Sequence, residues 1–589
     1  MKRNLLLIIP LLHATISANA QDFCMSDEVQ KELEVKDPSM ARARQDAEKR
    51  LFSMDIQKFL NSKETYKNIN GKYTDTVYTI PVVVHIIVPN NDAVGTTFNP
   101  SDDQVKKWID NTNKVFATTY GGIFPAEGSG NSDGTIMPFK LALAQRTKNC
   151  LATTGIIRYD ASNLGNYSSN GVGGTGVTAN EITAFAPHWP ESYYYNIYIV
   201  DTKISFATLP TVSDANYHAF MKANLVTRTE DFAVSILPHE FAHSLGLMHT
   251  FGNDETVCPA NNNCAIDNDK VCDTSPNKAY LNPLPNNTVI NPCTNELYDG
   301  IQYNMMSYCS PRKFTPGQRE RALLQFLSNR PSLTKSLAST DLTTAVGSPI
   351  PATCTISNSG ISSNLALGPT LVKLGSINNI STGRNISNPE YYIDYSAENC
   401  MTSSFYTDLT VQQSYNLQIG IKGSPQYVQA WIDYDNNGSF ETSELVSSSD
   451  VKLSIQHGFS DHTIWDDTIT PPATAVLNTP LRFRVRASGE TGACTTPNYG
   501  QVEDYTVILR AATTSSSEKR RMTDKFNMVY SKNGNKLISN ESIDNYKIFD
   551  MHGRLIQQGN ADAMEISLNF EQPGTYIFVT KNHNIKFNK

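Results

Sequence analysis

The sequence has no long run of like charge and, after its first residues, no apolar run long enough to cross a membrane as a helix. Its net charge of −8 is spread over 589 residues, so it offers no basic surface for nucleic acid. Cysteine is absent from the C-terminal part of the chain. These absences exclude a transmembrane protein and a nucleic-acid-binding protein. A chain of this length is expected to divide into several domains.

The N-terminus has the pattern of an export signal. Basic residues precede an apolar run from Leu5 to Leu12, and small residues follow up to Ala20. We expect residues 1–20 to form a signal peptide that is removed after export. A lipoprotein anchor is not expected, because it needs cysteine at the first mature position and Cys24 lies further on. The sequence therefore predicts a protein that is secreted or displayed at the cell surface, where disulfides can form.

Three histidines and one glutamate between His239 and His249 have the spacing of metal ligands. His239 and His243 would lie on the same face of a helix, with Glu240 beside them. If the helix continued, His249 would lie roughly 15 Å along its axis from His239, too far to share an ion. Gly246 can adopt a positive φ, so we expect the helix to end there and the chain to return His249 to the other imidazoles. The spacing predicts a metal site of the zinc type beside a carboxylate.

The other histidines of the chain show no ligand spacing. We interpret them as structural or surface residues, and this group includes His188 and His218. His85 lies inside an apolar strand pattern and is expected in the core.

The pattern His-Glu-x-x-His-x-x-Gly-x-x-His resembles the zinc signature of the metzincin metallopeptidases. Asn304 to Cys309 resembles the Met-turn of that family, which would place Met306 beneath the zinc and Tyr308 near it. Within the metzincins the chain is similar to the pappalysin branch, of the cytophagalysin and ulilysin type. The segments that carry this similarity are Ile80 to His85, Val271 to Thr274 and Phe314 to Gln318.

The resemblance implies a zinc endopeptidase that hydrolyses peptide bonds of extracellular proteins. His239, His243 and His249 would hold one catalytic zinc ion and leave a position for water. Glu240 would act as general base towards that water and then protonate the leaving amine. Tyr308 would help to stabilise the oxyanion. The rival interpretation is a cell-surface binding or adhesion protein that uses this fold as a scaffold, and the intact Glu240 argues against it.

One departure limits what the resemblance implies about the substrate. Arginine-specific members carry an aspartate just after the Met-turn, whereas Cys309 follows Tyr308 here. A preference for arginine is therefore not carried over. The family also has calcium sites near the segment of Asp273 and Thr274, and calcium at these residues is a further expectation.

Residues 21–72 precede the first convincing strand and are highly charged, with helical patches such as Met40 to Phe59. We expect a pro-segment that keeps the peptidase latent. Its only cysteine, Cys24, could place a thiolate at the fourth zinc position, as the zymogen switches of related families do. The alternative is an unpaired or bridging cysteine, because the family switch has glycine after the cysteine and Met25 stands there in this chain.

Cysteines are concentrated between the predicted zinc helix and the Met-turn, in a stretch with little periodicity. They are Cys258, Cys264, Cys272, Cys293 and Cys309. Disulfides would hold this stretch where a core cannot. With Cys150 they make an even number, compatible with pairing wholly inside the catalytic unit, and the connectivity is left open.

Residues 73–330 combine helices and strands in the α/β (α+β) pattern of a metzincin catalytic domain. Strands are predicted at Val77 to Ile87, Phe139 to Ala144 and Tyr194 to Val200. A capping box at Ser101 predicts one helix, and the zinc helix is expected from about Glu230. Thr315, followed by proline at the first helical position, predicts a closing helix through Leu327.

Residues 331–352 are rich in Ser and Thr and are predicted to be a linker. Residues 353–510 then show short alternating strands with Gly, Asn and Pro turns, which is typical of an all-β sandwich. Trp431 to Gly438 and Tyr499 to Tyr505 resemble the GEVED domain of secreted bacterial proteins, with Gln501 where the name motif has glutamate.

One loop of this domain has the spacing of a calcium-binding loop, with hard oxygens around a glycine turn. The oxygens would come from Asp433, Asp435, Asn437, Ser439 and Glu444. The alternative is a polar hairpin turn whose acids are solvated.

A second linker, residues 511–524, leads to a final β-rich unit, residues 525–589. Tyr546 to Arg554 and Pro573 to Ile577 resemble the C-terminal sorting domain of the type IX secretion system. The resemblance implies an address that the type IX secretion machinery recognises, and the alternative is one more small sandwich. We expect the mature protein to be a monomer.

Overall fold

A computed structural model of the chain divides into two compact units, Met1–Ala512 and Thr513–Lys589. The predicted signal peptide, residues 1–20, lies outside the described residues. The structure describes residues 24, 26–52, 54, 68–69, 72–73, 77–121, 134–203, 205–209, 218–252, 257–279, 284–308, 311–357, 367–385, 389–449, 451–453, 463–512, 528–531, 535–551, 553–570, 572–580 and 584–589. Within these residues, no helix combines the length and the apolar character that crossing a membrane requires.

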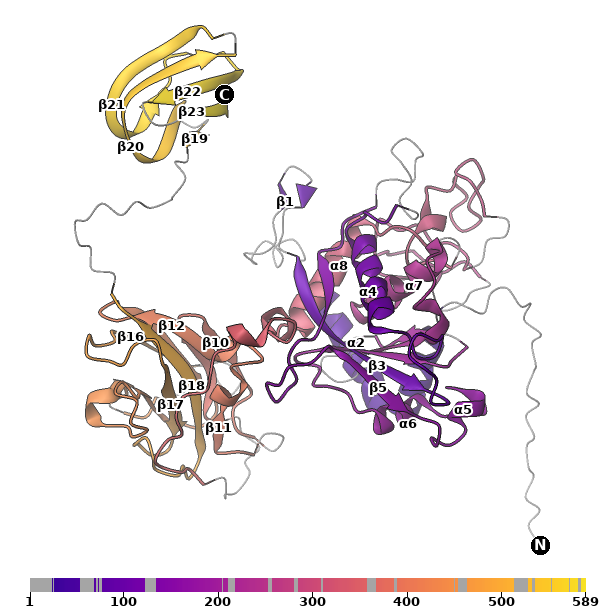
Figure 1. Ribbon diagram of the computed structural model, residues 1–589, viewed down its shortest axis with the longest axis horizontal. Coiled ribbons are helices and arrows are strands. Elements are labelled where there is room, and N and C mark those ends of the chain that lie inside the picture. Colours follow the sequence, from indigo (N-terminus) through magenta and orange to yellow (C-terminus); the bar gives the residue numbers. More distant parts are fainter. Residues whose placement is uncertain are drawn as a thin grey trace. The chain divides into compact units, whose positions relative to one another are not determined.

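The first unit begins with a six-stranded, mainly parallel sheet (Figure 1). Its order is β4-β3-β6-β8-β7, and β5 also pairs with β3. The strands are β3 (Tyr78–Val88), β4 (Phe139–Leu143), β5 (Ile156–Asp160), β6 (Tyr195–Val200), β7 (Phe206–Ala207) and β8 (His218–Lys222). β7 runs antiparallel to β8 at the edge of the sheet. The predicted strands are confirmed, and the continuous apolar sequence of β3 reflects burial on both faces of the sheet.

Three long helices pack with this sheet around one core. α4 (Asp102–Phe116) begins at a capping box formed by Ser101 and Gln104, as the sequence predicts. α7 (Asp231–Ser244) follows β8 and contains His239, Glu240 and His243 of the histidine motif. α8 (Pro316–Asn329) begins at a capping box formed by Thr315 and Gln318. The shorter helices are α5 (Tyr167–Asn170), α6 (Ala179–Phe185), η1 (Ala223–Leu225) and η2 (Ile301–Tyr303).

The N-terminal segment forms two helices, α1 (Ser26–Lys36) and α2 (Pro38–Phe52), and two short paired strands, β1 (Asn68–Ile69) and β2 (Lys72–Tyr73). Glu48 of α2 forms ion pairs with Lys270 at 3.0 Å and with Arg321 of α8 at 2.7 Å. These partly buried ion pairs connect the N-terminal segment to the peptidase part of the chain.

Disulfides cross-link the long stretch after α7, as the cysteine clustering predicts. Cys258 pairs with Cys293, and Cys264 pairs with Cys272. Cys150 pairs with Cys400, so the six cysteines do not pair wholly within the predicted catalytic domain, residues 73–330, as their even number would allow. The physical reason lies beside it: Arg146 donates hydrogen bonds to the carbonyl oxygens of Cys400 and Asp341, which brings the two distant segments together. A fourth disulfide joins Cys354 and Cys494, and Cys309 lies outside the described residues.

Residues from 367 onward form the predicted all-β sandwich (Figure 1). One sheet has the order β10-β9-β13-β16, and the other has the order β11-β18-β17-β14-β15 with β12 beside β18. Apolar side chains such as Ile419 and Phe483 fill the space between the sheets. The strands are β9 (Pro369–Leu374), β10 (Ile377–Ile380), β11 (Tyr392–Asp394), β12 (Tyr406–Thr410), β13 (Tyr415–Ile421), β14 (Tyr427–Ile432), β15 (Leu445–Ser448), β16 (Thr463–Ile469), β17 (Pro480–Ser488) and β18 (Gly500–Arg510). The intervening short helices are η3 (Leu333–Lys335), η4 (Leu342–Thr344), η5 (Tyr395–Glu398), η6 (Ser403–Phe405) and η7 (Thr442–Glu444).

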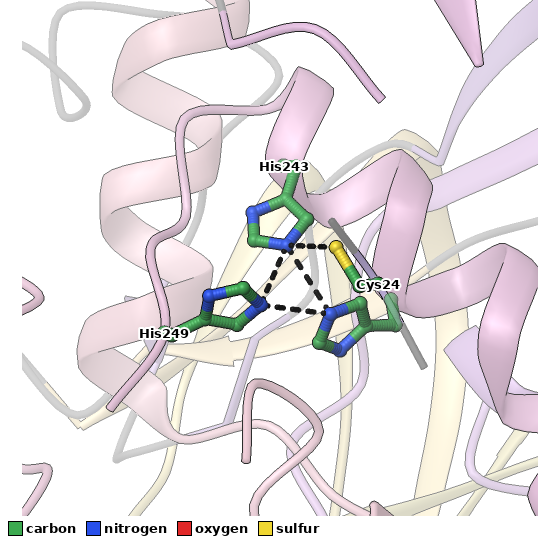
Figure 2. A group of neighbouring side chains, drawn as sticks. Cys24, His243 and His249 are labelled. Atoms are coloured by element: carbon green, nitrogen blue, oxygen red, sulfur yellow. Dashed lines mark hydrogen bonds between the residues drawn. The ribbon is translucent and has the colours of Figure 1, made fainter. Parts of the chain in front are cut away.

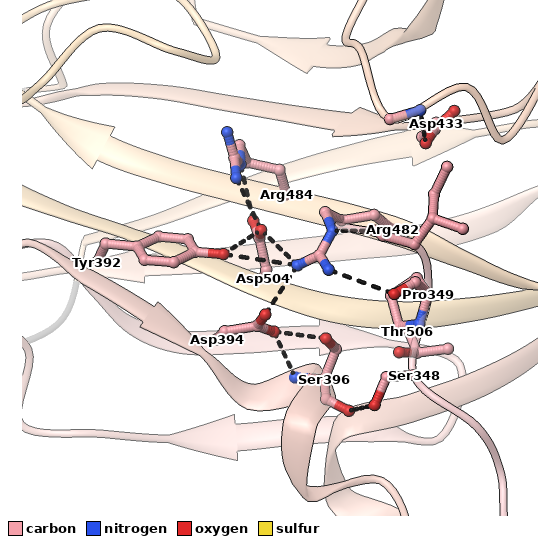
Figure 3. Close-up of polar contacts among 12 residues, drawn as sticks. Ser348, Pro349, Tyr392, Asp394, Ser396, Asp433, Arg482, Arg484, Asp504 and Thr506 are labelled. Atoms are coloured by element: carbon pink, nitrogen blue, oxygen red, sulfur yellow. Dashed lines mark hydrogen bonds and ion pairs between the residues drawn. The ribbon is translucent and has the colours of Figure 1, made fainter. Parts of the chain in front are cut away.

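The two acidic residues of β18, Glu503 and Asp504, are fully buried on opposite faces of the strand. Asp504 accepts hydrogen bonds from Arg482 at 2.9 Å and from Arg484 at 2.7 Å, and all three side chains are buried (Figure 3). Glu503 accepts a hydrogen bond from the Tyr505 hydroxyl at 2.6 Å. Burial raises the pKa of Glu503 to about 8, so this carboxyl group is mostly protonated at neutral pH. The motif thus combines one charged and one neutral acid.

The second unit is a five-stranded antiparallel sheet. Its order is β19-β20-β22-β23, with β21 beside β20. The strands are β19 (Met528–Ser531), β20 (Lys536–Asp550), β21 (Leu555–Ser567), β22 (Thr575–Thr580) and β23 (Asn584–Asn588). Leu537, Ile548 and Phe578 are fully buried at its centre, so this unit has a core of its own.

Candidate metal centre

The chain turns at Gly246, as the spacing of the motif predicts. α7 ends at Ser244, and Gly246 adopts a φ of 80°. A Cβ atom at this position would lie 2.6 Å from Cγ of Gln325, so both the backbone angle and the packing require glycine. The turn returns His249 to the face of α7 that carries His239 and His243.

The three imidazoles converge on one point (Figure 2). Their Nε2 atoms are 3.2 Å apart between His239 and His249, 3.2 Å between His239 and His243, and 3.0 Å between His243 and His249. Ligands of a tetrahedral zinc ion with bonds of about 2.0 to 2.1 Å lie about 3.3 Å from one another. The observed spacing therefore fits a single zinc ion.

Backbone carbonyl groups set the tautomer of two of these histidines. Nδ1–H of His239 donates to the carbonyl oxygen of Met305 at 2.7 Å, and Nδ1–H of His243 donates to that of Leu247 at 2.9 Å. Each Nε2 atom is then left with a lone pair directed at the common point. Burial and the neighbouring His249 lower the pKa of His239 to about 3, which keeps its imidazole neutral. Neutral imidazoles with fixed orientation are the form that binds a metal.

Glu240 is fully buried beside the imidazoles. Its Oε2 atom accepts a hydrogen bond from the Ser26 hydroxyl at 3.1 Å and lies 3.4 Å from Sγ of Cys24. The carboxylate predicted as general base is therefore covered by two residues of the N-terminal segment. Ser26 was not identified from the sequence, because nothing in its local context distinguishes it from other helix-capping serines.

The two residues of the predicted Met-turn, Met306 and Tyr308, are both buried. Met306 is fully buried in the core that supports α7. The ring of Tyr308 lies 4.8 Å from that of His249, between ring centroids. The Tyr308 hydroxyl donates a hydrogen bond to the carbonyl oxygen of Cys24 at 2.5 Å. Tyr308 thus already binds a peptide carbonyl group next to the histidine cluster.

Cys24 is the fourth member of the cluster (Figure 2). Its Sγ atom lies 3.3 Å from Nε2 of His243, and the four ligand atoms are all within 4.8 Å of one another. The thiol is buried and takes part in no disulfide among the described residues. This placement favours the switch over the bridging alternative.

The part of the chain that builds this centre can be compared with known families. Residues 177–326, which contain α7, His249 and Met306, match the model of the pregnancy-associated plasma protein-A family. This segment is a pappalysin peptidase domain. The pappalysin domain makes the chain a zinc metalloendopeptidase, and the histidine cluster is a group that can bind its metal. Residues 427–508 match the model of the GEVED domain, as the sequence predicts.

Solved structures similar to this chain include mirolysins from Tannerella forsythia. A promirolysin variant is 18% identical, with a TM-score of 0.39, over 53% of this chain and 97% of that chain. Mature mirolysin in complex with a cleaved peptide is 19% identical, with a TM-score of 0.35, over 44% of this chain and 97% of that chain. No curated protein matches the chain.

The acidic loop of the GEVED domain brings three of its predicted ligands together. One oxygen each of Asp433, Asp435 and Glu444 lies within 4.8 Å of the others. Asp433 accepts hydrogen bonds from the N–H groups of Asn437 at 3.0 Å and of Gly438 at 2.9 Å, so the backbone wraps around this carboxylate.

The carboxyl groups of this loop have raised pKa values. Burial raises the pKa of Asp433, and burial together with Glu441 raises the pKa of Glu444 to about 7. The Ser439 hydroxyl contacts the Thr353 hydroxyl at 3.1 Å.

Asp273 and Thr274 both form hydrogen bonds with other residues of the chain. Asp273 accepts hydrogen bonds from the Thr315 hydroxyl and from N–H of Gly317, both at 2.7 Å, at the start of α8. The Thr274 hydroxyl donates to Asp269 at 2.7 Å. These contacts fix the first turn of α8, and calcium at Asp273 and Thr274 stays a prediction.

Proposed function

We propose that the chain is a secreted endopeptidase that cleaves extracellular proteins and is held latent by its own N-terminal segment. The observation that carries this proposal is the convergence of three Nε2 atoms on one point, with Glu240 beside them and Cys24 closing the fourth side. A scaffold for adhesion would need no such arrangement.

His239, His243 and His249 would hold the zinc ion, and the peptide would be cleaved beside Glu240. When bound there, zinc supplies Lewis-acid chemistry that acidifies a water molecule and polarises the scissile carbonyl group. Glu240 takes the proton of the attacking water and passes it to the leaving amine. The Tyr308 hydroxyl, which here donates to the carbonyl oxygen of Cys24, would donate to the carbonyl oxygen of the substrate after the segment departs.

Latency would follow from the contacts of Cys24 and Ser26. A Cys24 thiolate would occupy the zinc position that water needs. The Ser26 hydroxyl binds Glu240 and also accepts the N–H group of Ala207 in the edge strand β7 at 2.9 Å. The segment thus blocks the metal, the general base and the edge of the sheet together.

Metal dependence tests this function directly. The processed enzyme should cleave casein, lose that activity in a zinc chelator and regain it when zinc is restored. A protein that stays inactive with zinc bound would support the adhesion alternative.

The acidic loop of the GEVED domain would bind calcium. The carboxylates of Asp433, Asp435 and Glu444 cluster within one ion's reach, and Asn437 lies beside them. Hard oxygen ligands of this kind suit calcium. Calorimetric titration of the full chain should show calcium binding that the Asp435→Asn variant weakens, whereas Asp408→Asn, at an exposed ion pair in β12, should leave it unchanged. Equal binding by both variants would favour a solvated polar turn.

Export would use both ends of the chain. Residues 1–20 would direct secretion, and residues 525–589 would be read by type IX secretion machinery. Removing residues 525–589 should leave the protein in the periplasm of a host with that system, and release into the medium would contradict the role.

A further inference from the structure

A second group of side chains that could bind a metal lies at the six-stranded sheet that packs with α7. It is separate from the histidine motif. Ligand atoms of His188, Glu191 and His218 lie within 4.8 Å of one another. His188 and Glu191 precede β6, and His218 is the first residue of β8. Because β6 and β8 are parallel neighbours and His218 pairs with Asn196, the chain brings these residues to the same end of the sheet. The sequence, in which His188 and His218 show no ligand spacing, does not predict this group, because only the pairing of β6 and β8 creates it.

Hydrogen bonds fix the tautomer of His188. The Tyr198 hydroxyl donates its one proton to the carbonyl oxygen of Ala186 at 2.8 Å. It must then accept from Nδ1–H of His188, which lies 3.0 Å away. Nε2 of His188 consequently carries a lone pair.

The other two groups are buried without hydrogen-bond partners. Nδ1 of His218 and both carboxylate oxygens of Glu191 have no partner among the described residues. Both side chains are 9% exposed. A buried carboxylate without donors carries a large desolvation cost, so such a group calls for a positive charge.

The separation of His218 and Glu191 suits a shared ion better than a direct bond. Nδ1 of His218 lies 3.8 Å from Oε1 of Glu191, which is too long for a hydrogen bond. Two ligands bound at about 2.0 to 2.2 Å to one ion are separated by roughly 3 to 4 Å.

We propose that His188, Glu191 and His218 form a second metal site that binds a divalent transition metal ion of the zinc type. Two imidazoles and one carboxylate are ligands that zinc accepts, whereas calcium and magnesium prefer oxygen ligands throughout. The ion neutralises Glu191 and takes up the lone pairs of both histidines.

The site would connect β8 to the strand that the N-terminal segment contacts. The carbonyl oxygen of His218 accepts N–H of Thr208 at 3.2 Å, directly after β7. Ala207, the preceding residue, donates its N–H group to Ser26 of the pro-segment. An ion at His218 therefore ties the loop before β6 to the strand that supports the edge of the sheet, and its role is structural.

Zinc content of the full chain tests the site. After reconstitution with zinc and desalting, elemental analysis should find two zinc ions per chain, one at each histidine group. Glu191→Gln should lose one of them, and His243→Ala should lose the other. Glu181→Gln is the matched control, because Glu181 is an exposed acid of α6 that caps its own helix, and it should keep both.

Thermal unfolding provides a second measurement, because the zinc content of a variant that folds poorly would not report on the site alone. Zinc should still raise the thermal unfolding temperature of His243→Ala, which keeps only the second site, and the double variant His243→Ala/Glu191→Gln should show no such rise. One zinc ion per wild-type chain, or equal zinc content in Glu191→Gln and Glu181→Gln, would overturn the proposal. The group would then be a buried contact of His218 with Glu191 that holds no metal.

Discussion

Sγ of Cys24 lies 3.3 Å from Nε2 of His243, although 219 residues separate them in the chain. The contact places a thiol of the N-terminal segment against the nitrogen that faces the metal position. Both groups are buried, so solvent offers them no competing partner. A metal ion at this point would be enclosed by three imidazoles and one sulfur, a closed set of four ligands.

Replacing Cys24 should release the latent enzyme. Cys24→Ala removes the fourth ligand while leaving the α1 and α2 contacts in place, so the unprocessed variant should cleave a peptide library that the unprocessed wild type does not cleave. X-ray absorption spectroscopy at the zinc edge should show a sulfur ligand of zinc in the unprocessed wild type and none after processing. Equal latency of the variant and the wild type would mean that steric cover alone blocks the site.

Weakening the Glu48 contacts should speed activation. Glu48 joins the N-terminal segment to Lys270 and Arg321, and both ion pairs are partly buried, so loss of the Glu48 charge should weaken this contact. Glu48→Gln should therefore shorten the lag before activity in autoprocessing assays. Glu34→Gln is the matched control, because Glu34 pairs with Arg44 inside the segment, and it should keep a wild-type lag.

Low pH should weaken the same ion pairs of Glu48 with Lys270 and Arg321. Burial raises the pKa of Glu48, but the pairs with Arg321 and Lys270 outweigh it and leave the pKa below its ordinary 4.5. A lowered folded-state pKa contributes stability above pH 4.5 that is lost as the pH falls through the lowered value. The lag of the wild type should shorten below pH 4.5, and this acid response should be absent from Glu48→Gln. An identical acid response in both would assign it to other groups.

Glycine should be required at position 246. Gly246→Ala combines a φ of 80° with a Cβ contact of 2.6 Å to Gln325, so it should displace His249 and lower the zinc content. Gly173→Ala meets a similar φ of 90° with no atom within 4 Å, and it should cost only the backbone strain, about 1 to 2 kcal/mol. Full zinc occupancy in Gly246→Ala would show that the turn tolerates a side chain.

The GEVED domain should lose stability as the pH rises. Burial raises the pKa of Glu503 to about 8 from 4.5 in the unfolded chain, so the stability present below pH 4.5 is lost as the pH rises through 8. Calorimetry of the full chain should show this decline in the unfolding transition of the sandwich. Glu503→Gln should remove it, and a decline unchanged in the variant would assign it elsewhere.

Local patterns in the sequence predict much of this molecule. The capping box of Ser101, the apolar run of β3 and the spacing from His239 to His249 depend on residues close in sequence, and each is found where expected. The contacts between segments that are distant in the sequence could not be predicted from such local patterns. Cys150 pairs with Cys400 because Arg146 binds that segment, and His218 meets Glu191 because β6 and β8 are neighbours. Ser26 meets Glu240 only because the N-terminal segment lies across the site.

The most direct test of the central claim compares the processed wild type with Glu240→Gln, measuring zinc content and peptide cleavage on the same samples. The account predicts equal zinc content and a loss of kcat/KM of roughly 1000-fold in the variant, because the general base is gone while the ligands remain. Glu181→Gln, the exposed control on α6, should match the wild type in both measurements. Wild-type cleavage by Glu240→Gln with zinc bound would contradict the account.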